Sequence, residues 1–254
     1  MTAASVRRSL APVVLGVLAL LAWQLFVQVS GVKPYLLPAP TAIWAQLVTV
    51  WPLVWRFALA TGTNVLVGLL LGALAAVGAA LLAARSRVVD ALMSPTAAAV
   101  AVMPIVALAP ALNTMFGTTT TTPRRLIVAV VVFAPVFVNT LRGLRQVLPV
   151  HRDLLRAYAA TPGQLARTVT VPGALPYLFT GLRIASSTGV IAAIVAEYFG
   201  GLQNGLGSRI TAAASNSAYA RAWAFVVGAI ALGLVFYLVT LGAEHAVARR
   251  QGAA

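Results

Sequence analysis

The chain has 254 residues, of which 61% are hydrophobic and only 9% are charged. Soluble domains are typically about half apolar and a quarter charged, so this composition excludes an ordinary soluble enzyme. A membrane-spanning helix needs about 20 apolar residues, and the length accommodates roughly six such helices with their loops. The sequence therefore predicts an all-α, polytopic membrane protein without a large soluble domain.

Six apolar runs are long enough to be membrane spans. Their approximate bounds are 10–29, 59–83, 91–112, 126–144, 177–199 and 223–243. The first run follows Arg7 and Arg8, as in a signal peptide, but it exceeds the roughly 7–15 apolar residues of a cleavable signal. We therefore expect an uncleaved first span. The third run contains Pro95, Pro104 and Pro110, which predict a kinked or broken helix.

The segment between the first two spans begins with a proline-rich loop at 31–40. A short helix is expected at 42–50, with Ile43, Trp44 and Leu47 on one face. Tryptophan favours the membrane–water interface, and three occur here: Trp44, Trp51 and Trp55. We expect this segment to lie along the outer membrane surface, although ordinary loop packing explains the tryptophans nearly as well.

The second span contains Gly68 and Gly72, a G-x-x-x-G pair that lets two helix backbones approach closely. Because the chain has 20 glycines, such a pair arises easily by chance. We therefore interpret it as packing within the subunit in preference to a dimer seam.

The charge balance is strongly basic, with 18 Lys+Arg against 4 Asp+Glu. No basic face with interleaved aromatic residues can be drawn, so nucleic-acid binding is excluded and contact with anionic lipid is favoured. If both termini are cytoplasmic, the inner residues are Arg7, Arg8, Arg85, Arg87, Arg142, Arg145, Arg152, Arg156, Arg167, Arg249 and Arg250. The outer residues are then Lys33, Arg56, Arg124, Arg125, Arg209 and Arg221. This inner excess agrees with the positive-inside rule.

The residues that most catalytic sites need are scarce. There is no cysteine, the only lysine (Lys33) lies outside any P-loop, and His151 and His245 lie in different segments. We expect no catalytic group, cofactor or metal site in this chain. Among the acids, only Glu197 falls within a span, near its outer end, where packing explains it at least as well as proton coupling. The energy source is therefore expected on another polypeptide.

The longest polar stretch between spans carries an ordered motif. Residues 153–172 read DLLRAYAATPGQLARTVTVP. This segment resembles the cytoplasmic loop of the membrane permeases of binding-protein-dependent ABC importers, whose pattern is E-A-A-x3-G-x9-I-x-L-P. The pattern's positions, in order, are filled by Asp153, Leu154, Leu155, Ala159, Val169, Val171 and Pro172. The spacing fits throughout, although leucine is bulkier than alanine and Ala159 replaces a flexible glycine.

Other segments strengthen the resemblance, in particular to the nitrate/sulfonate/taurine branch. They are 103–104, Pro110, 116–117, 133–135, 139–140, Gly143, 172–176, 181–183, 196–197 and 205–207. Together they cover roughly residues 55–245 and imply the type I ABC importer permease fold over that region. Residues 1–54 would then form an N-terminal transmembrane helix and an interfacial segment, and residues 246–254 a cytoplasmic tail.

The resemblance also implies partners and a place in the plasma or inner membrane. A cytoplasmic ABC ATPase dimer would supply the ATP and Mg site, a second copy would complete a homodimer, and an extracytoplasmic binding protein would deliver the solute. A short helix at 151–160, with Asp153 near its N-terminus, would enter a groove on the ATPase. Its contacts would come from Leu154, Leu155 and Tyr158 in the groove and from Arg152, Arg156 and Arg167 at the rim. A second short helix, at 164–170, would end at Pro172.

The translocation path is expected between two permease copies. Candidate lining residues are Asn139, Ser186, Ser187 and Thr188, polar positions that could instead bond a neighbouring helix. The residues alone also leave open a self-contained secondary transporter or channel, whereas a simple membrane anchor would not need proline-kinked helices. The branch resembled handles nitrate, sulfonates and taurine, with relatives for pyrimidine precursors and riboflavin-like compounds. Because selectivity in such importers resides mainly in the binding protein, the substrate stays open.

Overall fold

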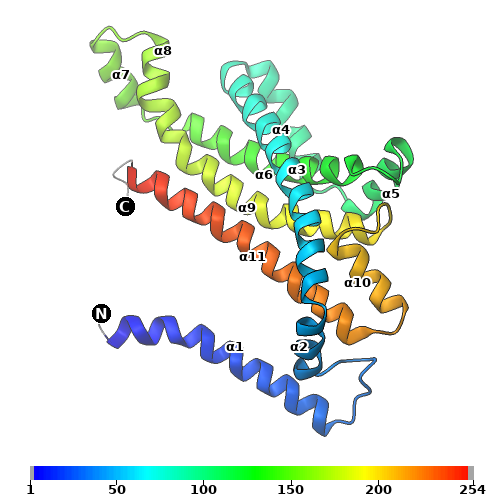
Figure 1. Cartoon of the computed structure of the whole chain (residues 1–254). Helices are drawn as coiled ribbons and strands as arrows, with labels where there is room; N and C mark the ends of the chain where they lie inside the picture. Colours follow the sequence, from blue (N-terminus) through cyan, green and yellow to red (C-terminus); the bar gives the residue numbers. More distant parts are fainter. Residues whose placement is uncertain (1–2, 251–254) are drawn as a thin grey trace.

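The computed structural model describes the backbone of residues 3–250 and the side chains of residues 11–249. All regular structure in this range is helical (Figure 1). The helices are α1 (Ala3–Val29), α2 (Pro40–Thr49), α3 (Trp51–Arg85), α4 (Arg87–Ala101), α5 (Ile105–Phe116), α6 (Thr122–Arg145), α7 (Pro149–Ala157), α8 (Pro162–Leu165), the π-helical turn η1 (Ala166–Thr170), α9 (Val171–Tyr198), α10 (Leu206–Ser215) and α11 (Tyr219–Arg250). Among the described residues, five stretches are long and apolar enough to cross a membrane, and they number six if the bent pair α4–α5 is counted as one span. The predicted polytopic all-α architecture is confirmed.

The N-terminal helix α1 stands apart from the remaining helices (Figure 1). It contacts α2, and the ring of Trp23 packs edge-on against Trp223 of α11 with centroids 5.3 Å apart. Most of its described side chains are exposed, which suits a helix surrounded by lipid. Helix α2 follows as expected, with Ile43 and Leu47 buried. The expectation that Trp44 shares their face is wrong, because Trp44 is exposed.

The predicted break in the third span is confirmed at Pro104. Helices α4 and α5 meet at an angle of 101° across residues 102–104. Pro104 stands at the N-cap of α5, where its missing N–H costs no helical hydrogen bond. Pro95 and Pro110 lie inside α4 and α5 without ending either helix.

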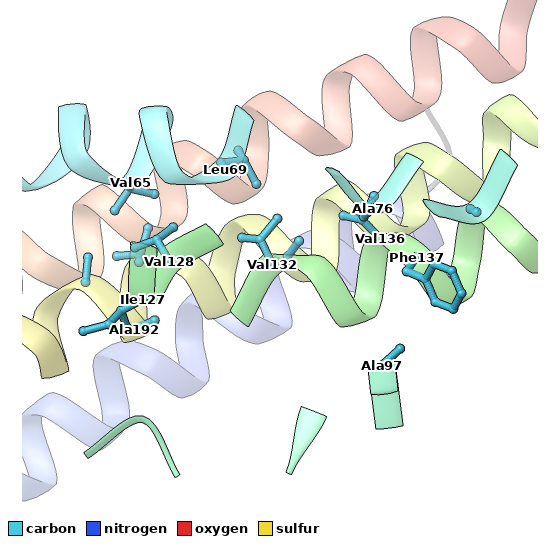
Figure 2. Close-up of a cluster of buried hydrophobic side chains, with 14 of the residues drawn as sticks. Val65, Leu69, Ala76, Ala97, Ile127, Val128, Val132, Val136, Phe137 and Ala192 are labelled. Carbon is cyan, nitrogen blue, oxygen red and sulfur yellow. The ribbon is translucent and has the colours of Figure 1, made fainter. Parts of the chain in front are cut away.

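The core forms where α6 packs between α3 and α9. Figure 2 shows Val65 of α3, Val128 and Val132 of α6 and Ala192 of α9 in this cluster, all four fully buried. Small and β-branched side chains dominate it, so the backbones lie close together. In a bilayer such close packing, more than exclusion of water, holds helices together.

Gly68 and Gly72 of α3 lie directly against α6. A β-carbon at Gly68 would be 2.5 Å from the β-carbon of Val128, and one at Gly72 would be 2.9 Å from the α-carbon of Ala129. The predicted packing of this pair within the subunit is confirmed.

We expect Gly68→Ala to force α3 away from α6, because the added methyl group would also lie 2.7 Å from the Arg125 carbonyl oxygen. Overpacking of this kind typically costs about 1–3 kcal/mol. Gly78→Ala in the same helix is the control, since nothing lies within 4 Å of its added β-carbon. Thermal unfolding of the detergent-solubilised protein checks the prediction, and equal midpoints for the two variants would contradict it.

One expectation about the segment that leads into α9 is wrong. Pro172 does not end a helix: α8, η1 and α9 form one continuous helical stretch over Pro162–Tyr198. Pro172 lies in the first turn of α9, directly after the widened π turn, where its missing N–H is tolerated. The segment between the last two expected spans, 200–221, contains α10.

The suggested division of the chain falls inside helices. The boundary after residue 54 lies within α3, and the one after residue 245 lies within α11. Residues 251–254 of the suggested tail, together with residues 1–2, lie outside the described residues.

Candidate docking loop and the opposite end of the helix core

The loop between α6 and α9 contains a short helix, α7, that lies at one end of the molecule (Figure 1). Leu154 is 54% exposed and Tyr158 is 76% exposed, and no residue of α7 is buried. Arg152 and Arg156 project from the opposite side of the helix, two residues before and after Leu154. Residues 149–172, which we call the docking loop, therefore present an apolar ridge without a covering segment among the described residues, as interaction surfaces do.

The docking loop is hollowed where α7 faces η1 and the start of α9. A cavity of about 480 Å³ there is lined by residues that include Leu154, Leu155, Val169 and Pro172. The structure thus brings together four residues of the sequence motif from its two ends. Leu155 is half-buried at this cavity, so it supports the loop more than it extends the exposed ridge.

The charged motif residues are more loosely held. Arg156 Nη1 lies 3.7 Å from Asp153 Oδ1, and both side chains are more than two-thirds exposed. A surface pair of this kind contributes little to stability. Asp153 is the fifth residue of α7, which begins at Pro149, so it lies beyond the first turn and not near the N-terminus as expected.

Helix α7 ends in a Schellman motif that explains the glycine of the sequence pattern. Ala159 has φ 52°, in the left-handed region. The N–H of Ala160 donates to the Leu155 carbonyl at 2.9 Å, and the N–H of Ala159 donates to the Arg156 carbonyl at 2.9 Å. Glycine is the usual residue at this position because it has no β-carbon to clash. Ala159 adopts the same backbone conformation at a cost in strain.

Replacing Ala159 with glycine should stabilise the docking loop by about 1 kcal/mol, because it removes the left-handed strain. Ala157→Gly, two residues earlier and inside α7, is the matched control and should destabilise the loop by about 0.5–1 kcal/mol. Hydrogen exchange of the α7 amides measures both effects. Equal losses of protection in the two variants would show that the turn carries no strain.

The docking loop is joined firmly to the membrane helices. The Gln146 side-chain amide donates to the Gly173 carbonyl at 2.6 Å, which ties the end of α6 to the start of α9. Thr161 and Gln164 form a capping box at the start of α8. Since α8, η1 and α9 are continuous, a displacement of the loop acts directly on a helix about 42 Å long.

The four candidate path residues do not converge on one site. Asn139 donates to a carbonyl one turn earlier in α6 at 2.7 Å, and Thr188 lies 3.2 Å from carbonyls of its own helix. Ser186 is buried, 3.1 Å from the Thr240 hydroxyl of α11. Ser187 lines a mostly apolar cavity of about 590 Å³ between α9 and α11. Helix-to-helix bonding, one of the two roles left open, is thus seen at Ser186.

A buried polar cluster lies at the other end of α9 from the docking loop. Its centre is Glu197, which is 1% exposed. The Glu197 carboxylate accepts from the Thr61 hydroxyl at 3.0 Å and from the Gly207 N–H at 3.0 Å. Arg124 Nη1 lies 3.7 Å from Glu197 Oε1 and is 2% exposed. The carboxylate is thus paired and hydrogen-bonded, as a buried charge must be.

The same cluster fixes the chain between α9 and α10. Arg124 donates to Asn204 Oδ1 at 2.7 Å and to the Leu202 carbonyl. The Thr61 hydroxyl accepts from the Leu206 N–H at 3.0 Å, so the first two amides of α10 are both satisfied. We call Thr61, Arg124, Glu197 and these α10 amides the Glu197 cluster. It joins α3, α6, α9 and α10.

Two glycines make this cluster possible. A β-carbon at Gly205 would collide with the Glu197 carboxylate, and one at Gly207 would collide with the Ile194 carbonyl. The feature of the sequence that could have indicated this cluster is the pair Gly205 and Gly207, which lie eight and ten residues after Glu197. The role of Arg124 was not predicted, because its position in the chain suggested only an arginine in an outer loop.

Comparisons with known proteins agree with this architecture. The family model described as "Binding-protein-dependent transport system inner membrane component" matches residues 68–252. A probable ABC transporter permease protein of Haemophilus influenzae is 33% identical over 79% of this chain and 81% of its own length. The riboflavin transport system permease protein of Chloroflexus aurantiacus is 32% identical over 77% of this chain and 73% of its own.

A solved structure shares the fold. The crystal structure of an amino acid ABC transporter with histidines superposes with a TM-score of 0.61 at 18% identity. The match covers 80% of this chain and 96% of that one. Since the family model spans well over half of the chain, the chain belongs to the binding-protein-dependent transport system inner membrane component family, and it is the permease subunit of an ABC importer in the inner membrane.

Proposed function

We propose that the docking loop is the contact through which a cytoplasmic ABC ATPase drives this permease. The observation that carries this proposal is the exposed apolar ridge of α7, at Leu154 and Tyr158, on a loop continuous with α9. An amphipathic helix that enters a groove is a common mode of protein recognition. The docking-loop end is then cytoplasmic, together with both termini, as the excess of arginine on that side favours.

In this proposal the chain forms the path and does no catalysis. ATP and Mg bind to a dimer of the partner ATPase, and two copies of the permease enclose the path between them. A solute-binding protein docks at the end of the helices opposite the docking loop. ATP favours one of two permease conformations only through a difference in affinity, which α7 transmits to α9 as a displacement of its first turn.

The transported solute is proposed to be a small organic molecule. The riboflavin permease of Chloroflexus aurantiacus resembles the chain over most of both sequences, so a nitrogen heterocycle of that kind is the first substrate to test. In this proposal, the apolar cavity beside Ser187 would contribute a surface of suitable character to the path.

Reconstitution into lipid vesicles tests the proposed function. Vesicles that hold the permease, its ATPase and the binding protein should accumulate riboflavin or a related heterocycle only when ATP is supplied on the ATPase side. Vesicles that hold the permease alone should accumulate nothing. Flux through the permease alone would instead support a self-contained transporter or channel.

A further inference from the structure

A cavity of about 560 Å³ lies between α4 and α6 at the docking-loop end of the molecule. Its inner wall is apolar and is formed by Phe137, Val138 and Leu141 of α6. Val138 is 54% exposed, although it lies seven residues before the end of α6, or about 10 Å along the helix axis. The apolar wall is therefore accessible within the span and not only at its end.

The rim of the same cavity is polar and carries Arg142 and Arg145, both in the last turn of α6. Arg145 is held in place by α4, because its Nη2 atom lies 2.8 Å from Asp90 Oδ2. Ser94 of α4, which also lines the cavity, donates to Asp90 Oδ1 at 2.9 Å. Asp90 thus positions the rim and neutralises one of its two arginines.

The second arginine of the rim, Arg142, has no counterion in the part of the chain that the structure describes. Its side chain is exposed and forms no ion pair or hydrogen bond with residues 11–249. The negative end of the α6 dipole stabilises a cation at this position. Two arginines and one aspartate leave the rim with one net positive charge, which a ligand with a single negative charge would neutralise.

The apolar wall and the cationic rim follow one another along one face of α6. Leu141, Arg142 and Arg145 lie three, four and seven residues after Val138, so these side chains share one side of the helix. The apolar residues lie nearer the middle of the span, and the arginines lie at its end. A phospholipid has the same order, with acyl chains in the hydrocarbon region and a charged phosphate at the boundary with water.

We propose that this cavity binds one anionic phospholipid, with an acyl chain against Val138 and the phosphate at Arg142. The inference rests on the proposed function for its side of the membrane, since the docking-loop end is then cytoplasmic. The cytoplasmic leaflet carries anionic lipids, and basic pockets between spanning helices on that side bind their headgroups. A cytoplasmic protein would reach the rim but not the wall within the span, whereas a lipid contacts both.

The bound lipid strengthens the junction between α4 and α6. The side chains of Arg145 and Asp90 are 48% and 28% exposed, so water weakens their attraction. A phospholipid over this end of α6 excludes part of that water and lowers the local dielectric constant, which strengthens the pair. Because the docking loop begins four residues after Arg145, the lipid also steadies the base of the loop.

Native mass spectrometry of the detergent-solubilised permease, titrated with phosphatidylglycerol, tests the proposal. Arg142→Gln should lower the affinity for the first bound phosphatidylglycerol about fivefold. Val138→Trp fills the apolar wall without a change of charge and should lower the affinity by a similar factor. Arg249→Gln, which removes one exposed charge from the end of α11, is the matched control and should leave the affinity unchanged. Phosphatidylcholine should bind the wild type at least fivefold more weakly.

Several results would overturn the lipid site. Equal affinity in Arg142→Gln and the wild type would do so, as would the same loss in Arg249→Gln. A loss in Arg142→Gln with none in Val138→Trp would place the lipid on the surface and not in the cavity.

Competition distinguishes the lipid from soluble ligands. Glycerol phosphate and riboflavin should not displace phosphatidylglycerol. Displacement by the first would make the cavity a site for soluble anions, and displacement by the second would make it part of the solute path, so either result would overturn the lipid site. Lipid binding is measured without transport, so absence of ATP-dependent uptake would instead reject the proposed function.

Discussion

Replacing Leu154 with arginine should abolish solute uptake by the reconstituted transporter while ATP hydrolysis by its partner continues. The side chain of Leu154 is 54% exposed on the ridge of α7. A guanidinium at this position would have to be desolvated in an apolar groove, which costs several kcal/mol without a partner. Loss of about 3 kcal/mol of docking free energy lowers the coupled rate at least a hundredfold.

Leu148→Arg is the matched control for this prediction. Leu148 is 56% exposed, but it precedes α7 and lies outside the ridge. Uptake and ATP hydrolysis, measured together in the same vesicles, should remain near the wild-type values for this variant. A permease that transports normally with arginine at 154, or one that loses transport equally with arginine at 148, would contradict the proposed role of α7.

Replacing Glu197 with alanine should destabilise the permease by about 3–5 kcal/mol, because it leaves Arg124 buried without its acid. Both side chains of this pair are at most 2% exposed, so solvent cannot compensate for the loss. The amide of Gly207 also loses its acceptor. Thermal unfolding of the detergent-solubilised protein measures the effect, together with the yield of folded protein in membranes.

Two further variants test whether the loss of stability comes from the buried pair or from a general sensitivity of α9 and α11 to substitution. The double variant Arg124→Met, Glu197→Met removes both charges and should recover at least about 1 kcal/mol relative to Glu197→Ala. Glu244→Ala breaks the pair with Arg183 and should cost less, because the Arg183 side chain that it leaves unpaired is 31% exposed to solvent. A double variant less stable than Glu197→Ala would show that the pair is not the source of the loss.

Much of the fold could be predicted from the sequence because bilayer solvation leaves few choices. Apolar runs of sufficient length must be helical in a bilayer. Five long helices, and a further helical stretch broken by proline, could therefore be predicted from the runs alone. The errors lie at boundaries. Pro172 was expected to end a helix, but a π turn carries the chain past it, and such a turn has no simple sequence pattern. Trp44 was expected on one face with Ile43 and Leu47, but it is exposed whereas they are buried.

The candidate sites were predictable to different extents. The docking loop could be located because its motif is local, and Ala159 even occupies the left-handed position that the motif's glycine implies. For the polar residues proposed for the path, the sequence could not decide the role of each side chain. A serine or threonine in a span can face a path, its own helix or a neighbour, and Ser186 bonds to α11.

By itself, the sequence determined that this protein is a helical membrane protein, because 61% of its residues are hydrophobic, and the motif at 153–172 indicated an ABC importer permease. Only the tertiary structure decided which charged side chains form ion pairs with one another within the chain. Glu197 and Arg124 are 73 residues apart, and close packing of α6 and α9 brings them together. Contacts between other helices likewise pair Asp90 with Arg145 and Glu244 with Arg183, and such contacts cannot be read from composition.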